Sequence, residues 1–95
     1  MQRSEKIKCV AYHYDRKHQL QQAFEEMGEL IVAVCKYADG HENEKAVLKD
    51  KIIDEIADVC VLMEQMKLFY GPKEVEDRID FKIDRQIERI CMGRD

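Results

Sequence analysis

The chain has a single proline, Pro72, in 95 residues, and long stretches on both sides of it place apolar residues at helical spacing. Charged residues make up 38% of the chain and hydrophobic residues 45%. This composition is typical of long amphipathic helices and argues against a β-sandwich or a disordered tail. The length suffices for one domain, which we assign to residues 1–95. We therefore predict a single all-α domain.

The periodicity and the helix-breaking residues predict four helices. They are expected at about residues 5–13, at about 16–38, from between 42 and 48 to about 70, and from 72 onward. Gly40 ends the second segment, and Gly71 ends the third. Pro72 suits the first turn of the last helix, and Gly93 is expected to cap that helix at its C-terminus.

Apolar residues lie on more than one side of each long helix. The main stripe of the second helix comprises Leu20, Phe24, Met27, Leu30, Ile31 and Val34, and that of the third comprises Ile52, Ile53, Ile56, Val59, Cys60, Met63 and Met66. Val32, Ala33, Ala57 and Val61 lie outside these stripes. A helix that is apolar on several sides is covered on several sides, and a helix longer than about 30 Å is long for so small a monomer. We expect a helical bundle of the two long helices and the C-terminal helix, completed by oligomerisation as a homodimer or homotetramer.

Charge, hydropathy and cysteine spacing exclude several classes of partner. The formal charge of −4 gives no reason to expect nucleic-acid binding. No apolar run approaches the roughly 20 residues needed to cross a bilayer, and the polar N-terminus does not resemble a signal peptide. The four cysteines include no C-x-x-C pair, so we expect reduced thiols in a cytoplasmic protein, with Cys35 and Cys60 buried.

Two acidic clusters lie in the most apolar parts of the chain. They are Glu25-Glu26-Met27-Gly28-Glu29 and Glu55-Ile56-Ala57-Asp58. Each contains two carboxylates three residues apart, a spacing that places both on one face of a helix. Carboxylates seldom enter apolar surroundings unless they are paired or hold a metal. The clusters therefore indicate a candidate site rather than an ordinary charged surface.

Helical geometry predicts how the two clusters meet. Glu55 falls inside the edge of the apolar arc, between Leu62 and Met66, and Asp58 lies one step further out. If the two helices pack antiparallel, the two carboxylate pairs face each other. The predicted metal ligands are Glu26, Glu29, Glu55 and Asp58. An all-oxygen site of this kind suits Mg²⁺, with Mn²⁺ as a possible substitute.

Two other interpretations compete with a magnesium site. A dinuclear iron site in a helical bundle needs Glu-x-x-His pairs, and the chain has none. We expect His13, His18 and His41 to lie away from both clusters, as surface or loop residues. The second alternative is a non-enzymatic helical interaction protein whose acidic clusters only solubilise a bundle. Burial of Glu55 distinguishes this alternative from a metal site, because such a protein has no reason to bury that carboxylate.

The two clusters also carry a family resemblance. Glu26-x-x-Glu29 followed by Glu55-x-x-Asp58 resembles the signature of the MazG-like all-α nucleoside triphosphate pyrophosphohydrolases. Residues 19–31 (QLQQAFEEMGELI) are similar to the first motif helix of this family, and residues 54–59 (DEIADV) to the second. Residues 81–90 (FKIDRQIERI) are similar to the C-terminal helix of its short, phage-like members. The likeness extends over about residues 12–92.

The resemblance implies an activity and assigns roles to residues. The implied reaction is Mg²⁺-dependent hydrolysis of a nucleoside triphosphate between the α and β phosphates, which releases a nucleoside monophosphate and pyrophosphate. In the family, the residues that match Glu26, Glu29, Glu55 and Asp58 coordinate Mg²⁺. Glu25 points to a different side, so it either holds a second metal, orients the attacking water or is simply a surface residue.

Four further residues are candidates for substrate binding. Gln19 and Gln22 lie on the same band of the second helix as the carboxylates, where they either contact the base or sugar or are solvated. Lys82 and Arg85 are candidates for the β and γ phosphates, because a metal ion alone seldom balances a triphosphate. A solvated charged face is the alternative for these two, and Lys36 is a weaker candidate of the same kind.

Overall fold

The computed structural model describes residues 1–93, which form four α-helices, one 3₁₀ turn and no β-strand. The elements are α1 (Arg3–His13), α2 (Arg16–Asp39), the 3₁₀ turn η1 (Glu42–Glu44), α3 (Lys45–Tyr70) and α4 (Pro72–Cys91). The predicted all-α class is confirmed, and each predicted segment corresponds to one helix. Within residues 1–93, no helix is both long enough and apolar enough to cross a bilayer.

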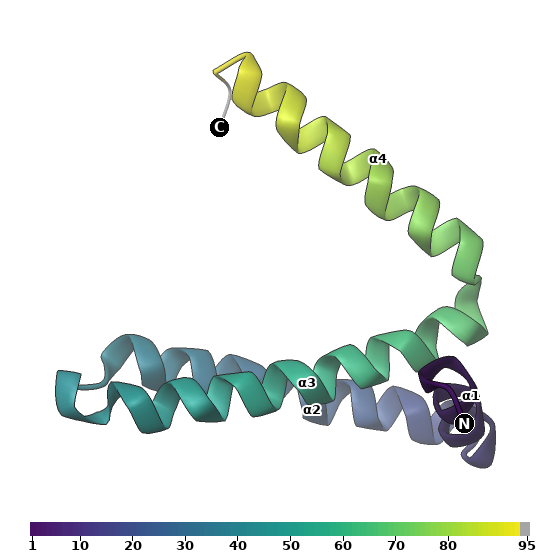
Figure 1. The fold of residues 1–95 in the computed structure, drawn as a ribbon, viewed down its shortest axis with the longest axis horizontal. Helices are drawn as coiled ribbons and strands as arrows, with labels where there is room; N and C mark the ends of the chain where they lie inside the picture. Colours follow the sequence, from purple (N-terminus) through teal and green to yellow (C-terminus); the bar gives the residue numbers. More distant parts are fainter. Residues whose placement is uncertain (94–95) are drawn as a thin grey trace.

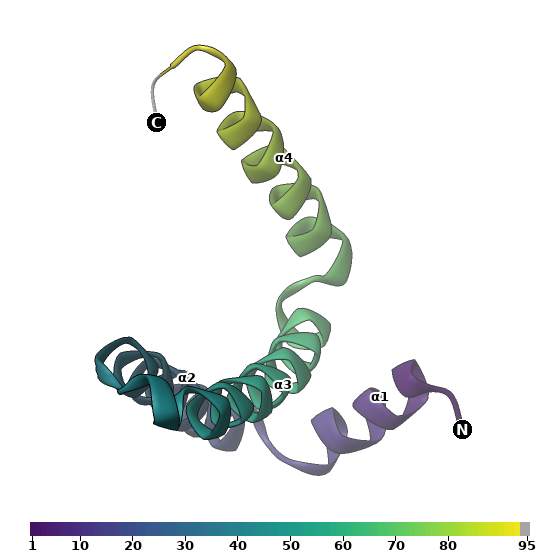
Figure 2. The same ribbon diagram turned by 60° about the vertical axis from the view of Figure 1, so that its left-hand side comes forward.

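The two long helices form an antiparallel hairpin from which α4 projects. Figure 1 shows α2 and α3 side by side, joined at one end by η1. Helix α1 packs against α3 near the end of the hairpin that lies opposite η1. In Figure 2, α1 lies apart from α2. Helix α4 leaves the end of α3 and extends away from the hairpin. The hairpin is therefore the part of the chain that can position a site.

Local signals set the helix boundaries. The Asp15 side chain accepts a hydrogen bond of 2.7 Å from the backbone N–H of His18 and so caps the N-terminus of α2. Gly71 ends α3 with a φ of 112°, a conformation that favours glycine, and its N–H donates to the carbonyl of Lys67. Pro72 then occupies the first turn of α4, as predicted.

Small and polar side chains form much of the interface between α2 and α3. The buried and half-buried residues of α2 include Gln19, Ala23, Glu26, Leu30, Ala33 and Tyr37, and those of α3 include Leu48, Ile52, Glu55, Val59, Leu62 and Met66. Both sets follow helical spacing of three or four residues, which places each on one face of its helix. In residues 1–93 the buried hydrophobic residues are Ala11, Ala23, Ala33 and Leu62. One chain alone therefore has a very small core.

The main apolar stripe predicted for α2 does not form this core, and that part of the prediction is wrong for the single chain. Phe24 is 79% exposed and Ile31 64% exposed. The row that contains Ala23 and Glu26 faces α3 instead, so the apolar stripe turns outward. Cys35 and Cys60, which we expected to be buried, are exposed as well.

Helix α4 is amphipathic, and its apolar face is uncovered in the chain. Its apolar stripe includes Ile79, Ile83, Ile87 and Ile90, which are all exposed. At the junction, Lys67 Nζ on α3 forms an ion pair of 2.6 Å with Glu76 Oε1 on α4. Gly93 follows the helix with a φ of 67°, consistent with the predicted C-terminal cap.

Candidate metal centre

Four carboxylates converge between α2 and α3. Glu26 and Glu29 extend from α2, and Glu55 and Asp58 extend from α3. One carboxylate oxygen from each residue can be chosen so that all four lie within 4.8 Å of one another. The two helices run antiparallel (Figure 1), and the two carboxylate pairs face each other between them. The structure thus brings together the four residues that the sequence singled out.

Burial in this group is uneven, and one carboxylate lies deep in the chain. Glu55 is only 2% exposed, as expected from its position in the apolar arc, whereas Glu26 is half-buried and Glu29 and Asp58 are exposed. The Oε1 atom of Glu55 pairs with Lys51 Nζ at 2.7 Å. This hydrogen bond raises the pKa of Lys51. A single lysine does not balance four neighbouring carboxylates.

Burial and electrostatic repulsion both perturb the half-buried carboxylate of Glu26. The pKa of Glu26 is raised, first because burial disfavours its charged form and then because Glu29, Asp58, Glu55 and Glu25 repel that charge. Binding of a proton or a cation lowers the free energy of a carboxylate in this environment. Neutralisation by a cation leaves all four groups ionised and relieves their mutual repulsion.

The donor set fits a hard divalent cation. Oε2 of Glu26 and Oε2 of Glu55 are buried and have no hydrogen-bond partner among the described residues. Buried carboxylate oxygens normally have a partner, so these two atoms are available as ligands. The group contains only oxygen donors, which favours Mg²⁺ or Mn²⁺ over zinc or iron.

A pocket of about 260 Å³ adjoins the carboxylates on the side nearest α1. Glu26, Asp58, Gln19 and Gln22 all line it, so both glutamines lie beside the carboxylate group as predicted. Gln19 is only 4% exposed, which excludes the solvated alternative for this side chain. It donates a hydrogen bond from Nε2 to Oε1 of Gln65, at 3.3 Å.

Sequence reasoning missed three polar residues of this pocket: Tyr14, His18 and Gln65. The expectation that His18 lies away from both clusters is wrong, because it lines the same pocket as Glu26. Its position eight residues before Glu26 is two helical turns along one face, which was a usable signal. Gln65 likewise follows Asp58 by seven residues, about two turns of α3. Tyr14 lies between two helices, where periodicity gives no information.

Two of the remaining candidates lie beside the four-carboxylate group and two lie apart from it. Glu25 and Lys36 line an open hollow that Glu29 and Glu55 of the group also line, together with Lys51. Lys82 and Arg85 lie on α4 and line neither this hollow nor the pocket beside Gln19. Within one chain, the structure does not bring those two cations to the carboxylates.

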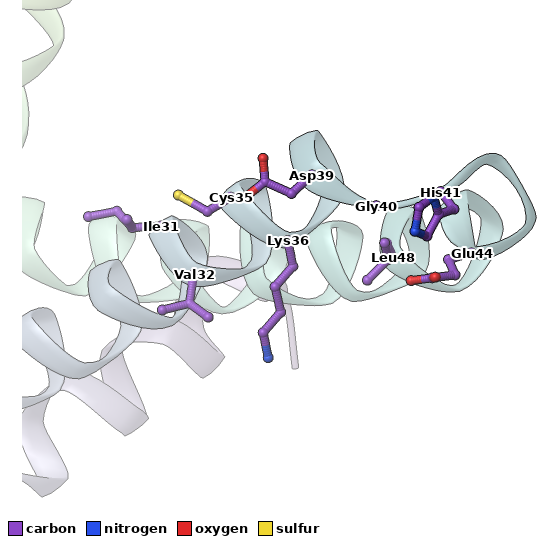
Figure 3. A pocket seen from close by; sticks show the side chains of 9 residues that line it. All are labelled: Ile31, Val32, Cys35, Lys36, Asp39, Gly40, His41, Glu44 and Leu48. Carbon is purple, nitrogen blue, oxygen red and sulfur yellow. The ribbon is translucent and has the colours of Figure 1, made fainter.

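Another hollow, of about 550 Å³, lies at the η1 end of the hairpin and is drawn in Figure 3. Cys35 and Asp39 extend to one side of α2, whereas Val32 and Lys36 extend to the other (Figure 3). The polar groups that line this hollow therefore do not converge on one point. The carboxylate group and its adjoining pocket remain the stronger candidate site.

Comparisons of this chain with protein-family models, with curated proteins and with solved structures found no match. The fold and the site themselves define the class: an all-α chain with four carboxylates gathered between two antiparallel helices.

Proposed function

We propose that this chain is a Mg²⁺-dependent nucleoside triphosphate pyrophosphohydrolase, a MazG-like enzyme that cleaves its substrate between the α and β phosphates. The products are a nucleoside monophosphate and pyrophosphate. The observation that carries the proposal is the convergence of four carboxylates, one of them almost fully buried, beside a pocket lined by amide side chains. The motif resemblance supplies the substrate class, and the geometry supports it.

The chain's own residues suit the proposed chemistry. Glu26, Glu29, Glu55 and Asp58 would hold the ion, with Mn²⁺ as a possible substitute. A bound Mg²⁺ neutralises phosphate charge and activates water in reactions of this class. Lys51 Nζ forms an ion pair with Oε1 of Glu55, and Oε2 has no partner among the described residues. The ion pair therefore orients the buried carboxylate in the metal-free chain.

The pocket beside Gln19 and the hollow lined by Glu25 indicate how a nucleotide would lie in the site. The pocket beside Gln19 reaches Glu26 and Asp58, so a nucleoside bound there directs its phosphates toward the carboxylates. Glu25 lines the hollow that Glu29 and Glu55 also line, where it would hold a second ion or orient water. The proposal includes a cytoplasmic location, where nucleoside triphosphates and reduced thiols are both found.

The purified protein should release pyrophosphate from at least one ribonucleoside or deoxyribonucleoside triphosphate when Mg²⁺ is present. The test is a panel of all the common nucleotides, with pyrophosphate and the nucleoside monophosphate measured separately. Equal amounts of the two products identify cleavage between the α and β phosphates. The absence of turnover across the panel, in Mg²⁺ and in Mn²⁺, would contradict the proposed function.

The proposal also includes a second copy of the chain, because one copy leaves too much surface uncovered. The single chain exposes 7667 Å², whereas a compact monomer of 11.3 kDa exposes about 5,700 Å². The excess of about 2,000 Å² per chain is what an obligate dimer interface buries. The radius of gyration is 16.7 Å, compared with about 12.4 Å for a compact domain of this length.

We infer that the outward stripe of α2 and the apolar face of α4 pack against another copy, in a homodimer or homotetramer. On the α2 stripe Phe24 is 79% exposed, and on the α4 face Ile83 is 53% exposed. If Lys82 and Arg85 contact substrate phosphates, they then do so from a neighbouring subunit. A helical interaction protein also needs such a surface, but it has no use for the buried Glu55.

Substituting Ile83→Glu should weaken the oligomer, because it places a charge in the centre of the apolar face of α4. We expect subunit affinity to fall by at least about 30-fold, or about 2 kcal/mol. The measurement is the molar mass in solution by sedimentation equilibrium over a dilution series. Arg78→Glu, on the opposite side of α4, is the matched control and should behave like the unchanged chain. An unchanged dissociation constant for Ile83→Glu would contradict the interface.

A further inference from the structure

The pocket beside the carboxylates contains an incompletely paired amide. The Oε1 atom of Gln19 is buried and has no hydrogen-bond partner among the described residues, although Nε2 of the same side chain donates to Gln65. The residue is 4% exposed, so a ligand in the pocket that Gln19 lines reaches this atom only if the side chain turns toward it. A buried acceptor without a partner destabilises the empty site. A ligand that donates a hydrogen bond to this atom removes the penalty.

The two amides together present both donors and acceptors. Gln19 Nε2 donates to Gln65 Oε1, so the Oε1 atom of Gln19 remains as an acceptor and both N–H groups of Gln65 remain as donors. If both amides turn over, Gln19 presents its N–H groups and Gln65 its oxygen, so donors and an acceptor still remain. The hydrogen-bonding edge of a nucleobase also combines donors and acceptors. The amide pair therefore complements such an edge, and its orientation selects the base.

Two aromatic side chains line the same pocket. The rings of Tyr14 and His18 stack on each other with their centroids 4.2 Å apart and an interplanar angle of 18°. Both residues line the pocket with Gln19 and Gln65. Nucleobases stack on aromatic faces with little dependence on base identity. Each ring covers one face of the other, so a base would stack on an outer face of the pair while the amides contact its edge.

The dimensions of the pocket suit a nucleobase. Its volume of about 260 Å³ lies just below the range of about 300–1,000 Å³ for sites that bury a whole drug-sized ligand. Glu26 and Asp58 line the same pocket, so it adjoins the carboxylate group. A base between the aromatic rings and the amide pair thus leaves its phosphates on the side of the carboxylates.

We propose that this pocket binds the nucleobase of the substrate, and that Gln19 and Gln65 determine which base is accepted. Tyr14 and His18 supply a stacking surface that does not discriminate between bases. The inference rests on the proposed function for its triphosphate, but recognition of the base requires no hydrolysis.

Calorimetric titration of the protein with five nucleoside monophosphates, one for each common base, tests this inference directly. We expect at least about a tenfold difference in affinity between the preferred and the poorest base. Gln19→Leu should reduce that ratio by about tenfold, because it removes the acceptor and keeps the side-chain size. Tyr14→Leu should instead weaken binding of all five by a similar factor. Gln21→Leu, an exposed glutamine on the same helix, is the control and should change neither quantity.

A second amide variant covers the case in which Gln19→Leu does not fold. Gln65→Met alters the other half of the pair at a half-buried position and should also reduce the discrimination. Equal affinity for all five monophosphates, or full discrimination in the folded amide variants, would overturn the inference. Pyrophosphate release with unchanged discrimination in the variants would overturn this inference alone. Amide-dependent discrimination without pyrophosphate release would support the base site and contradict the proposed hydrolysis.

Discussion

Glu55→Gln should abolish pyrophosphate release while leaving the helical fold intact. The substitution preserves the size of the side chain and removes its charge. Because the carboxylate is 2% exposed and has one unpaired buried oxygen, no solvent molecule or neighbouring side chain takes its place as a ligand. We expect turnover to fall by at least about 100-fold, the upper range for residues that only support metal ligands. Pyrophosphate release at saturating nucleotide and Mg²⁺ measures the loss.

Asp54→Asn is the matched control for this experiment. Asp54 directly precedes Glu55 on α3 but is exposed and lies outside the four-carboxylate group. Its substitution removes the same charge and should leave turnover unchanged. Glu55→Gln deprives Lys51 of its partner, but that lysine side chain is 60% exposed, so the effect on stability is small. A folded Glu55→Gln protein that keeps a substantial part of its activity would exclude Glu55 as a ligand.

Mg²⁺ should raise the melting temperature of the protein strongly even without nucleotide. Four carboxylates within 4.8 Å of one another destabilise the metal-free fold by repulsion, and the unfolded chain does not hold them together. An ion at about 100 times its dissociation constant stabilises the fold by about 2.7 kcal/mol. In a chain of this length that corresponds to a rise of about 10–20 °C. Thermal unfolding followed by circular dichroism across a Mg²⁺ titration measures it.

Sodium chloride at matched ionic strength separates specific binding from screening of the carboxylates. The sodium series should produce only a small shift, and Glu26→Gln should reduce the response to Mg²⁺. Equal shifts in the two salts would count against a defined metal centre.

Protonation of Glu26 should stabilise the metal-free fold, as Mg²⁺ binding does. The pKa of Glu26 in the folded chain is raised above its ordinary value of 4.5, so the folded state binds more protons than the unfolded state just above that pH. The stability contributed by this group is therefore present at acid pH and lost as the pH rises through the folded pKa. Metal-free protein should lose stability over that window relative to Glu26→Gln, which has no group to titrate there.

Sequence patterns predicted the local features of this chain well. The four helices, the all-α class and the break at Gly71 were all predictable, because capping residues, proline and helical spacing act over a few neighbouring residues. The spacing that places Glu26 and Glu29 on one face of α2, and Glu55 and Asp58 on one face of α3, was predictable for the same reason. One added assumption, antiparallel packing of two neighbouring helices, was enough to bring the four residues together.

The packing of the faces was not predictable from the same patterns. The strongest apolar stripe of α2, which includes Phe24 and Ile31, faces outward, while the row with Ala23 and Glu26 faces α3. Periodicity shows that a helix has an apolar side but not which neighbour covers it. In a chain that leaves about 2,000 Å² of excess surface, the most apolar faces are those that a second copy would cover.

The sequence by itself determined the helices and the spacing of the carboxylates. Only the tertiary structure decided that one oxygen of Glu55 has no partner, that Lys51 pairs with the other, and that His18 and Gln65 share a pocket with Asp58. The physical reason is the range of the interactions. Helix formation depends on residues a few positions apart, whereas burial, repulsion and pocket shape depend on segments that meet only when the chain folds back on itself.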